Sequence, residues 1–203
     1  MEGPMPSLSL TDLVDVVSRA GTPKATKVAE IKNRNAYHPA TDFYKALRDG
    51  IIEVHRAGKG KKALGSLIGA ITDRKKLTNY PPAIDGYKKW WGKKTITWFE
   101  PPRETYVHAG VEVSVNPELG LVVNGNRHVV KLYLKADPLS KLRVDLVTVL
   151  MDVGLAGKLQ PGDVVALLDV RRAKLFVLSA PVGPTKAVVD AELAYVAALW
   201  PRV

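Results

Sequence analysis

The hydrophobic pattern of this chain changes its period near Thr95, and this change limits the fold class. Upstream of Thr95, apolar residues recur at intervals of three and four, which is typical of amphipathic helices. Downstream, apolar and polar residues alternate, as they do in half-buried strands. The sequence therefore predicts an α+β fold, with a helical N-terminal half packed on a small mixed β-sheet. We expect residues 1–100 to form a mainly helical basic region and residues 101–203 to form a sheet plus helices, together one cooperative unit.

Glycine, proline and polar residues divide the helical half into short segments. Ser9 or Thr11 can cap the first helix, and the residues before it are expected to form a loose leader. Tyr80-Pro81-Pro82 should open the last of these helices, because proline is tolerated in a first helical turn. The expected helices cover about residues 9–19, 24–33, 41–57, 63–71 and 83–91.

The second half contains short alternating runs separated by turn signals. Asn124-Gly125-Asn126 predicts a hairpin, since Asn-Gly accepts the positive φ angles of a type I′ turn. Pro138 is expected to open a helix before the chain returns to the sheet. The expected strands cover residues 95–99, 106–115, 119–123, 128–135, 164–170 and 174–178, and the expected helices cover residues 139–153 and 185–199.

The composition excludes several classes of site. The chain has no cysteine, so disulfides, thiolate zinc sites and cysteine nucleophiles are ruled out. No run of about 18 apolar residues occurs, so no transmembrane segment is expected. The N-terminus lacks the basic and apolar regions of a signal peptide, so we expect a cytoplasmic protein. No Walker phosphate loop, Gly-x-Ser-x-Gly setting or histidine cluster occurs, so no cofactor is expected.

The positive charge is concentrated in one part of the chain. The net charge is +10, and residues 56–94 hold 11 Lys or Arg against only two acids, Asp73 and Asp85. A local positive field of this kind attracts polyanions such as DNA, RNA or an anionic membrane surface. The alternative is a solvated basic face without a partner.

Residues 87–94 (Tyr-Lys-Lys-Trp-Trp-Gly-Lys-Lys) combine side chains that suit phosphates and bases. Lysine binds phosphate, and an exposed indole offers a face on which a base can stack. The same mixture suits a membrane interface, and in a third interpretation the tryptophans belong to the core. The nucleic-acid hypothesis assigns contacts to Lys59, Lys61, Lys62, Arg74, Lys75, Lys76, Lys88, Lys89, Trp90, Trp91, Lys93, Lys94 and Lys135.

The first two predicted helices have the proportions of a helix-turn-helix. In that motif the second helix enters the major groove, and its exposed side chains contact base edges. Those contacts would fall on Lys24, Lys27, Lys32 and Arg34. Two consecutive short helices are also common in helical regions that bind nothing.

The order of elements between about residues 104 and 170 is strand, strand, strand, helix, strand, with a helix upstream. Together with Pro117-Glu118 at the second strand and Lys131 on the third, it resembles the αβββαβ core of the restriction-endonuclease-like superfamily, whose nucleases carry a PD-(D/E)XK signature. The resemblance implies a divalent metal, Mg²⁺, that activates water, with Glu118 and Lys131 as catalytic residues. The residue two before Lys131 is Val129, so the signature lacks its second acid.

Three functions remain open from the sequence. The first is a non-catalytic nucleic-acid-binding protein, in which Lys131, Tyr133 and Lys135 share one strand face and extend the basic surface. The second is a Mg²⁺-dependent nuclease of the restriction-endonuclease-like superfamily with an atypical site. The third is an inhibitor or assembly module whose basic face docks an acidic protein partner.

Overall fold

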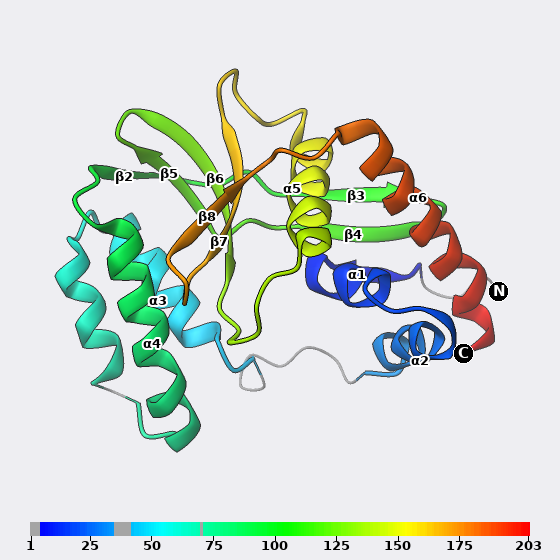
Figure 1. The fold of residues 1–203 in the computed structure, drawn as a ribbon, viewed down its shortest axis with the longest axis horizontal. Helices are drawn as coiled ribbons and strands as arrows, with labels where there is room; N and C mark the ends of the chain where they lie inside the picture. The colour runs from blue at the N-terminus through cyan, green and yellow to red at the C-terminus, as the bar shows by residue number, and fades with distance from the viewer. Residues whose placement is uncertain (1–4, 35–41, 70) are drawn as a thin grey trace.

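A computed structural model describes residues 5–34, 42–69 and 71–203, and it has a mixed α+β fold (Figure 1). This confirms the predicted fold class. The strands are β1 (Ser7–Ser9), β2 (Ile96–Phe99), β3 (Glu104–His108), β4 (Val111–Val115), β5 (Leu119–Val123), β6 (Asn126–Tyr133), β7 (Val164–Asp169) and β8 (Lys174–Val177). The helices are α1 (Leu10–Val17), α2 (Gly21–Lys32), α3 (Lys45–Arg56), α4 (Arg74–Trp91), α5 (Lys141–Leu155) and α6 (Val182–Leu199), with 3₁₀ segments η2 (Lys61–Ile68) and η3 (Trp200–Arg202).

A five-stranded sheet forms the centre of the molecule, with the strand order β2-β5-β6-β7-β8. Its neighbours pair antiparallel except for β6 and β7, which are parallel. Helix α5 makes the crossover that two parallel neighbours require. The β5–β6 hairpin turns at Asn124 and Gly125, whose φ angles are 49° and 89°. These angles confirm the hairpin predicted from Asn-Gly.

A separate three-stranded sheet, with the order β1-β4-β3, corrects two expectations. Residues 106–115 are not one strand but part of the antiparallel β3–β4 hairpin, because Ala109 and Gly110 turn at φ angles of 49° and 74°. The expected leader contributes β1, which pairs in parallel with β4. The first strand of the αβββαβ order in the central sheet is therefore β2, which follows α4.

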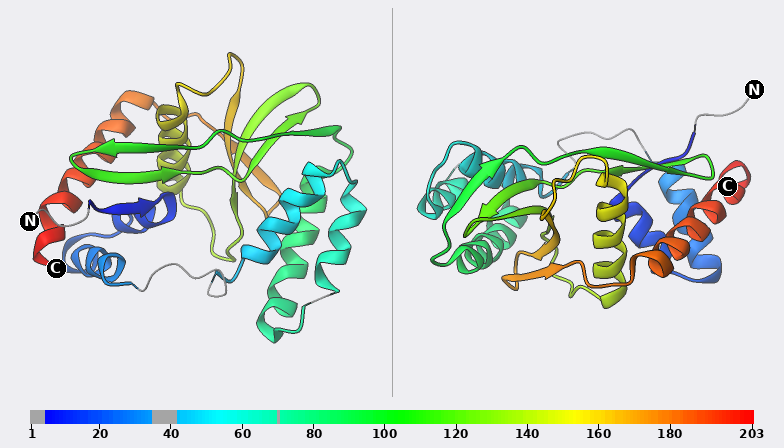
Figure 2. Two further views of the ribbon diagram at one scale, coloured as in Figure 1. Left: turned by 180° about the vertical axis from the view of Figure 1, so that it is seen from behind. Right: turned by 90° about the horizontal axis from the view of Figure 1, so that it is seen from above.

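Two hydrophobic clusters lie on opposite faces of the central sheet (Figures 1 and 2). One cluster joins α1, α2, α5 and α6 with the three-stranded sheet, and the other joins α3, η2 and α4. Successive residues of β6 serve both, since Val129 belongs to the first cluster and Val130 to the second. In β7, Val165 and Ala166 divide in the same way. The helices of the first hundred residues are thus shared between the two faces.

The ends of the helices follow local capping. The Ser9 hydroxyl accepts a hydrogen bond from the Asp12 backbone N–H at 3.1 Å, so Ser9 rather than Thr11 is the cap of α1. The expected start of the last N-terminal helix near Ala83 is wrong. Asp73 caps α4 by accepting from the Lys76 N–H at 3.0 Å, and Pro81-Pro82 lie inside the helix.

Candidate functional site

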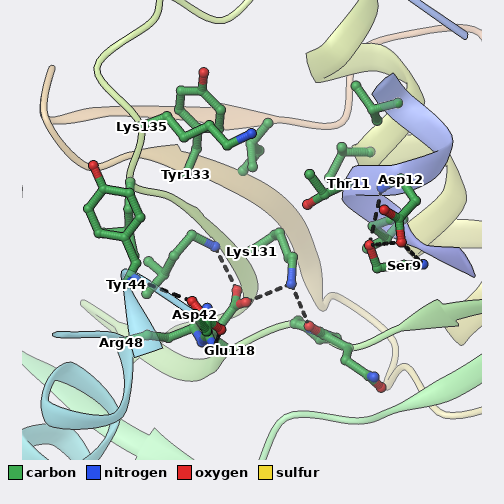
Figure 3. A pocket seen from close by; sticks show the side chains of 18 of the residues that line it. Ser9, Thr11, Asp12, Asp42, Tyr44, Arg48, Glu118, Lys131, Tyr133 and Lys135 are labelled. Carbon is green, nitrogen blue, oxygen red and sulfur yellow. Dashed lines mark hydrogen bonds and ion pairs between the residues drawn. The ribbon is translucent and has the colours of Figure 1, made fainter. Parts of the chain in front are cut away.

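A cavity of about 1090 Å³ opens beside β6, where the first turns of α1 and α3 approach the central sheet. Figure 3 shows side chains from these elements pointing into a shared space. Lys131, Tyr133 and Lys135 all line it, as expected for alternate residues of one strand. The predicted row therefore exists, but it borders a cavity rather than an open sheet face.

Glu118 and Lys131, which the family resemblance pairs, are in direct contact. The Lys131 ammonium donates to Glu118 Oε1 at 2.6 Å and to the Asn116 carbonyl at 2.9 Å. The second carboxylate oxygen of Glu118 accepts from the Leu132 backbone N–H at 2.8 Å. Both side chains are mostly buried, with 10% of Glu118 and 19% of Lys131 exposed. The sequence thus located a real pair, and each carboxylate oxygen of this pair already holds a partner.

A second ion pair lies beside Glu118 and was not predicted (Figure 3). Arg48, on the first turn of α3, donates to Asp42 at 2.7 Å. Burial lowers the pKa of Arg48, but its hydrogen bond to Asp42 and the charges of Asp42 and Glu118 raise that pKa by more. Nothing in the local pattern signals that α3 faces the start of β5, because this contact is set by tertiary packing.

The cavity wall carries charges of both signs, with more bases than acids. The bases are Arg34, Arg48, Arg103, Lys131, Lys135 and Arg143, and the carboxylates are Asp12, Asp42, Asp49 and Glu118. Arg34 pairs with Asp12 at 2.8 Å, and Arg143 with Asp15 at 3.0 Å. Lys135 makes no ion pair with any residue in the described ranges.

The residues present do not fit the predicted Mg²⁺ site. In the described part of the chain, no three His, Cys, Asp or Glu side chains lie close enough to hold a metal ion. Val129 is fully buried in a hydrophobic cluster, so the position of the missing second acid faces the core. Glu118 is the one acid at the expected place, and both of its oxygens are occupied by donors.

The basic segment, residues 56–94, folds into the end of α3, η2 and α4 on one side of the central sheet (Figure 1). Arg56 pairs with Glu100 at 3.0 Å, Lys61 donates to the Gly92 carbonyl at 2.5 Å, and Lys94 donates to the Trp90 carbonyl. The latter two lysines close the C-terminal end of α4. The other predicted bases make no side-chain hydrogen bond or ion pair within the described residues: Lys59, Lys62, Arg74, Lys75, Lys76, Lys88, Lys89 and Lys93.

Trp90 and Trp91 are buried, and this corrects their predicted part as stacking platforms. Only 5% of Trp90 and 8% of Trp91 are exposed. The Trp91 ring stacks on His55 at 4.4 Å between centroids, and His55 bonds to the Tyr87 hydroxyl at 2.6 Å. The tryptophans fall on the apolar stripe of α4, which faces the sheet, so helical periodicity directs them into the core.

The proposed recognition helix is also engaged within the protein. Lys24 pairs with Glu192 at 2.6 Å, and Lys32 donates to the Trp200 carbonyl at 2.8 Å. These contacts hold α2 against α6 and η3. Lys27 pairs with Glu30 at 3.1 Å, and Arg34 pairs with Asp12. Three of the expected base contacts of a helix-turn-helix, Lys24, Lys32 and Arg34, are thus bonded to other elements of the fold, and Lys27 is paired within α2.

In comparison with known proteins, no protein-family model and no curated sequence matches this chain. None of the helices in the described ranges has both the length and the apolar character needed to cross a membrane. The function is therefore inferred from the chain's own geometry and charge.

Proposed function

We propose that this protein binds nucleic acid, without catalysis, through the basic segment. The observation that carries the proposal is the set of eight cationic side chains in that segment that make no side-chain hydrogen bond or ion pair within the described residues. Six of them are exposed and two are half-buried, the exposed ones being Lys59, Lys62, Arg74, Lys75, Lys89 and Lys93. A base without an internal carboxylate keeps its full attraction for a phosphate group, and the segment contains only two acids.

Phosphate contacts of this kind release counterions from the nucleic acid. The logarithm of the binding constant then falls linearly with the logarithm of the salt concentration, with a slope of about −0.9 per phosphate neutralised on a duplex. Because Trp90 and Trp91 are buried, the proposal assigns the affinity to the cations and assigns no stacking to these rings.

Fluorescence anisotropy with labelled single- and double-stranded DNA and RNA, at about 50 and 200 mM salt, tests the proposal. Lys89→Glu combined with Lys93→Glu should weaken binding and reduce the salt slope by about two, one for each phosphate that is no longer neutralised. The matched control is Lys141→Glu with Lys174→Glu, which changes the net charge equally at exposed positions outside the segment.

Equal weakening by the two double variants would mean that only net charge matters, and this would contradict a defined surface. Absence of binding at about 50 mM salt would end the nucleic-acid proposal. The acidic protein partner would then be the hypothesis to pursue, since the same eight cations suit a carboxylate-rich surface.

A nuclease is the second candidate, because Glu118 and Lys131, which the family resemblance pairs, lie next to each other; a metal would have to displace the donors that occupy both Glu118 oxygens. The order α4, β2, β5, β6, α5, β7 supports the same family resemblance. The test is strand cleavage with and without Mg²⁺ or Mn²⁺, in the wild-type protein and in Glu118→Ala. Cleavage that depends on both the metal and Glu118 would favour it, and intact DNA under all conditions would exclude it.

A further inference from the structure

The cavity beside β6 is lined by a base, Lys135, that no ion pair of the described residues compensates. Its six basic side chains face four carboxylates, which leaves two positive charges in excess. Three of the carboxylates pair with bases of the same wall, and Asp49 bonds to Lys45 outside it. Two of the bases also pair outside the wall, Arg143 with Asp15 and Arg103 with Glu100, so Lys135 is the lining base that makes no ion pair within the described residues. A ligand that fits this wall electrostatically is an anion.

The unused polar groups are neighbours on one strand face. Lys135 is exposed and lacks an ion pair among the described residues, and Tyr133 precedes it by two positions. The Tyr133 hydroxyl is buried, and its hydrogen has no acceptor in the described part of the chain, although the Arg143 guanidinium lies close enough to donate to its oxygen. A buried hydroxyl without a partner is costly, by about 1–3 kcal/mol, unless something else supplies the hydrogen bond.

Arg143 stands near the same hydroxyl. Burial raises the pKa of Tyr133, and the charge of Arg143 lowers it by less, so the hydroxyl stays protonated and able to donate. The Arg143 guanidinium uses one nitrogen for Asp15 at 3.0 Å. Tyr133, Lys135 and Arg143 therefore provide donors of hydrogen bonds along one side of the cavity.

Part of the remaining wall is apolar and suits an organic ligand. Leu139, Val147 and Leu167 line it, and the Tyr44 ring is held by Phe43 at 4.8 Å and by Tyr80 at 6.2 Å between centroids. A volume of about 1090 Å³ is far larger than an inorganic anion needs and is comparable to small-molecule sites. The cavity thus combines donors for an anion with an apolar surface for a ring.

We propose that this cavity binds a nucleoside monophosphate, with the phosphate held by Lys135, Tyr133 and Arg143 and the base held against the apolar wall. The phosphate would compensate the positive charge of Lys135, and its oxygens are of the type that accepts from all three side chains. The site is independent of the proposed nucleic-acid surface, because no residue of the 56–94 segment lines the cavity. It also leaves the Glu118–Lys131 pair intact.

Isothermal titration calorimetry of the whole protein with uridine 5′-monophosphate, uridine and inorganic phosphate, at constant ionic strength, tests the proposal. The nucleotide should bind at least about tenfold more tightly than either fragment, because one charge-assisted hydrogen bond is worth about that factor. Lys135→Met should weaken nucleotide binding by about tenfold, and Tyr133→Phe by about fivefold. Lys174→Met, at an exposed lysine on β8, is the control and should change nothing.

Thermal unfolding of each variant establishes that it is folded before its affinity is compared. Failure of the nucleotide to bind at about 1 mM, or equal affinity in Lys135→Met and the wild type, would overturn the proposal. Inorganic phosphate that binds as tightly as the nucleotide would also overturn it, since the apolar wall would then have no part.

Two sources of the same chemical group remain to be distinguished, a free nucleotide and the phosphorylated end of a strand. The probes are short oligonucleotides with a 5′-phosphate or a 5′-hydroxyl, applied to Lys89→Glu/Lys93→Glu so that the basic segment contributes less. A gain from the 5′-phosphate that disappears with Lys135→Met identifies strand ends as ligands. Equal binding of the two oligonucleotides, with nucleotide binding retained, identifies the free nucleotide.

Discussion

At the scale of single residues, buried charge is tolerated in this protein because each charge is bonded. Glu118 accepts from the Lys131 ammonium at 2.6 Å and from the Leu132 N–H at 2.8 Å. Taking such a pair out of water costs solvation energy, so its net contribution to stability can be small. Removal of one partner is a different matter, because it leaves the other charge buried alone.

Glu118→Gln and Lys131→Met should therefore each destabilise the protein, and the sum of the two single effects should exceed the effect of the double variant. We expect each single change to lower the free energy of unfolding by about 2–3 kcal/mol, and a coupling energy of about 1–2 kcal/mol between them. Urea denaturation of the four proteins measures this. Additive effects would show that the pair contributes no interaction of its own.

His55 gives the stability of the protein a dependence on pH. Burial lowers the pKa of His55 to about 4, so the ring stays neutral in the folded protein. The unfolded chain has an ordinary pKa near 6.5 and takes up a proton as the pH falls below that value. Between pH 6.5 and 4 the unfolded state thus binds more protons than the folded state, and stability decreases as the pH falls.

Because of His55, the free energy of unfolding should be about 3 kcal/mol lower at pH 4 than at pH values above 6.5. His55→Gln removes the titrating group and should flatten the pH profile between 6.5 and 4, whatever its effect at pH 7. Chemical denaturation at several pH values compares the two slopes. Parallel profiles for the variant and the wild type would rule out His55 as the source.

At the scale of elements, the basic helix α4 is held against the central sheet by a close backbone approach. A Cβ on Gly86 would lie 2.1 Å from the Val170 carbonyl oxygen and 2.9 Å from that of Arg171. Both atoms belong to the backbone, so no side chain can turn away to make room. Glycine at this position allows α4 to pack on the end of β7.

Gly86→Ala should consequently lower the free energy of unfolding by about 3 kcal/mol or more, because the helix must move away from the sheet. Gly183→Ala is the matched control, since a Cβ there meets nothing within 4 Å and the position is helical. The control should be neutral or slightly stabilising, because alanine favours a helix over glycine by up to about 1 kcal/mol. Thermal and urea denaturation of both variants measures the difference. An equal loss of stability in Gly86→Ala and Gly183→Ala would contradict the close approach.

At the scale of the whole molecule, the two hydrophobic clusters share the strands of one sheet. Val129 and Val130 on β6 belong to opposite clusters, as do Val165 and Ala166 on β7. Loss of one helical layer would expose the apolar face of strands that the other layer still covers. The expectation of a single cooperative unit stays a prediction, and the shared strands are its physical basis.

This prediction can be tested with tryptophan fluorescence. Trp90, Trp91 and Trp98 belong to the cluster with α3 and α4, whereas Trp200 packs on the other cluster. In Trp200→Phe, fluorescence should therefore report on one cluster while far-ultraviolet circular dichroism reports on all helices. We expect the same urea midpoint from both signals. A fluorescence transition at lower urea would mean that the α3–α4 layer unfolds by itself.

Local pattern alone determined the α+β class, the Asn124-Gly125 hairpin and the common face of Lys131, Tyr133 and Lys135. These features depend on period and turn chemistry, which neighbouring residues specify. The start of α4 was predicted wrongly. Asp73 caps this helix, whereas Pro81-Pro82, which were expected to open it, lie inside it. The three-stranded sheet was missed because the turn at Ala109-Gly110 lies within a continuous β pattern.

Tertiary structure decided which side chains face solvent and which meet across the cavity. The two adjacent tryptophans, Trp90 and Trp91, have the composition of a binding surface, but the sheet covers the stripe on which they lie. Asp42 and Arg48 approach Glu118 only because α3 packs over the start of β5. A sequence period states that residues share a face, and only long-range packing determines what covers that face.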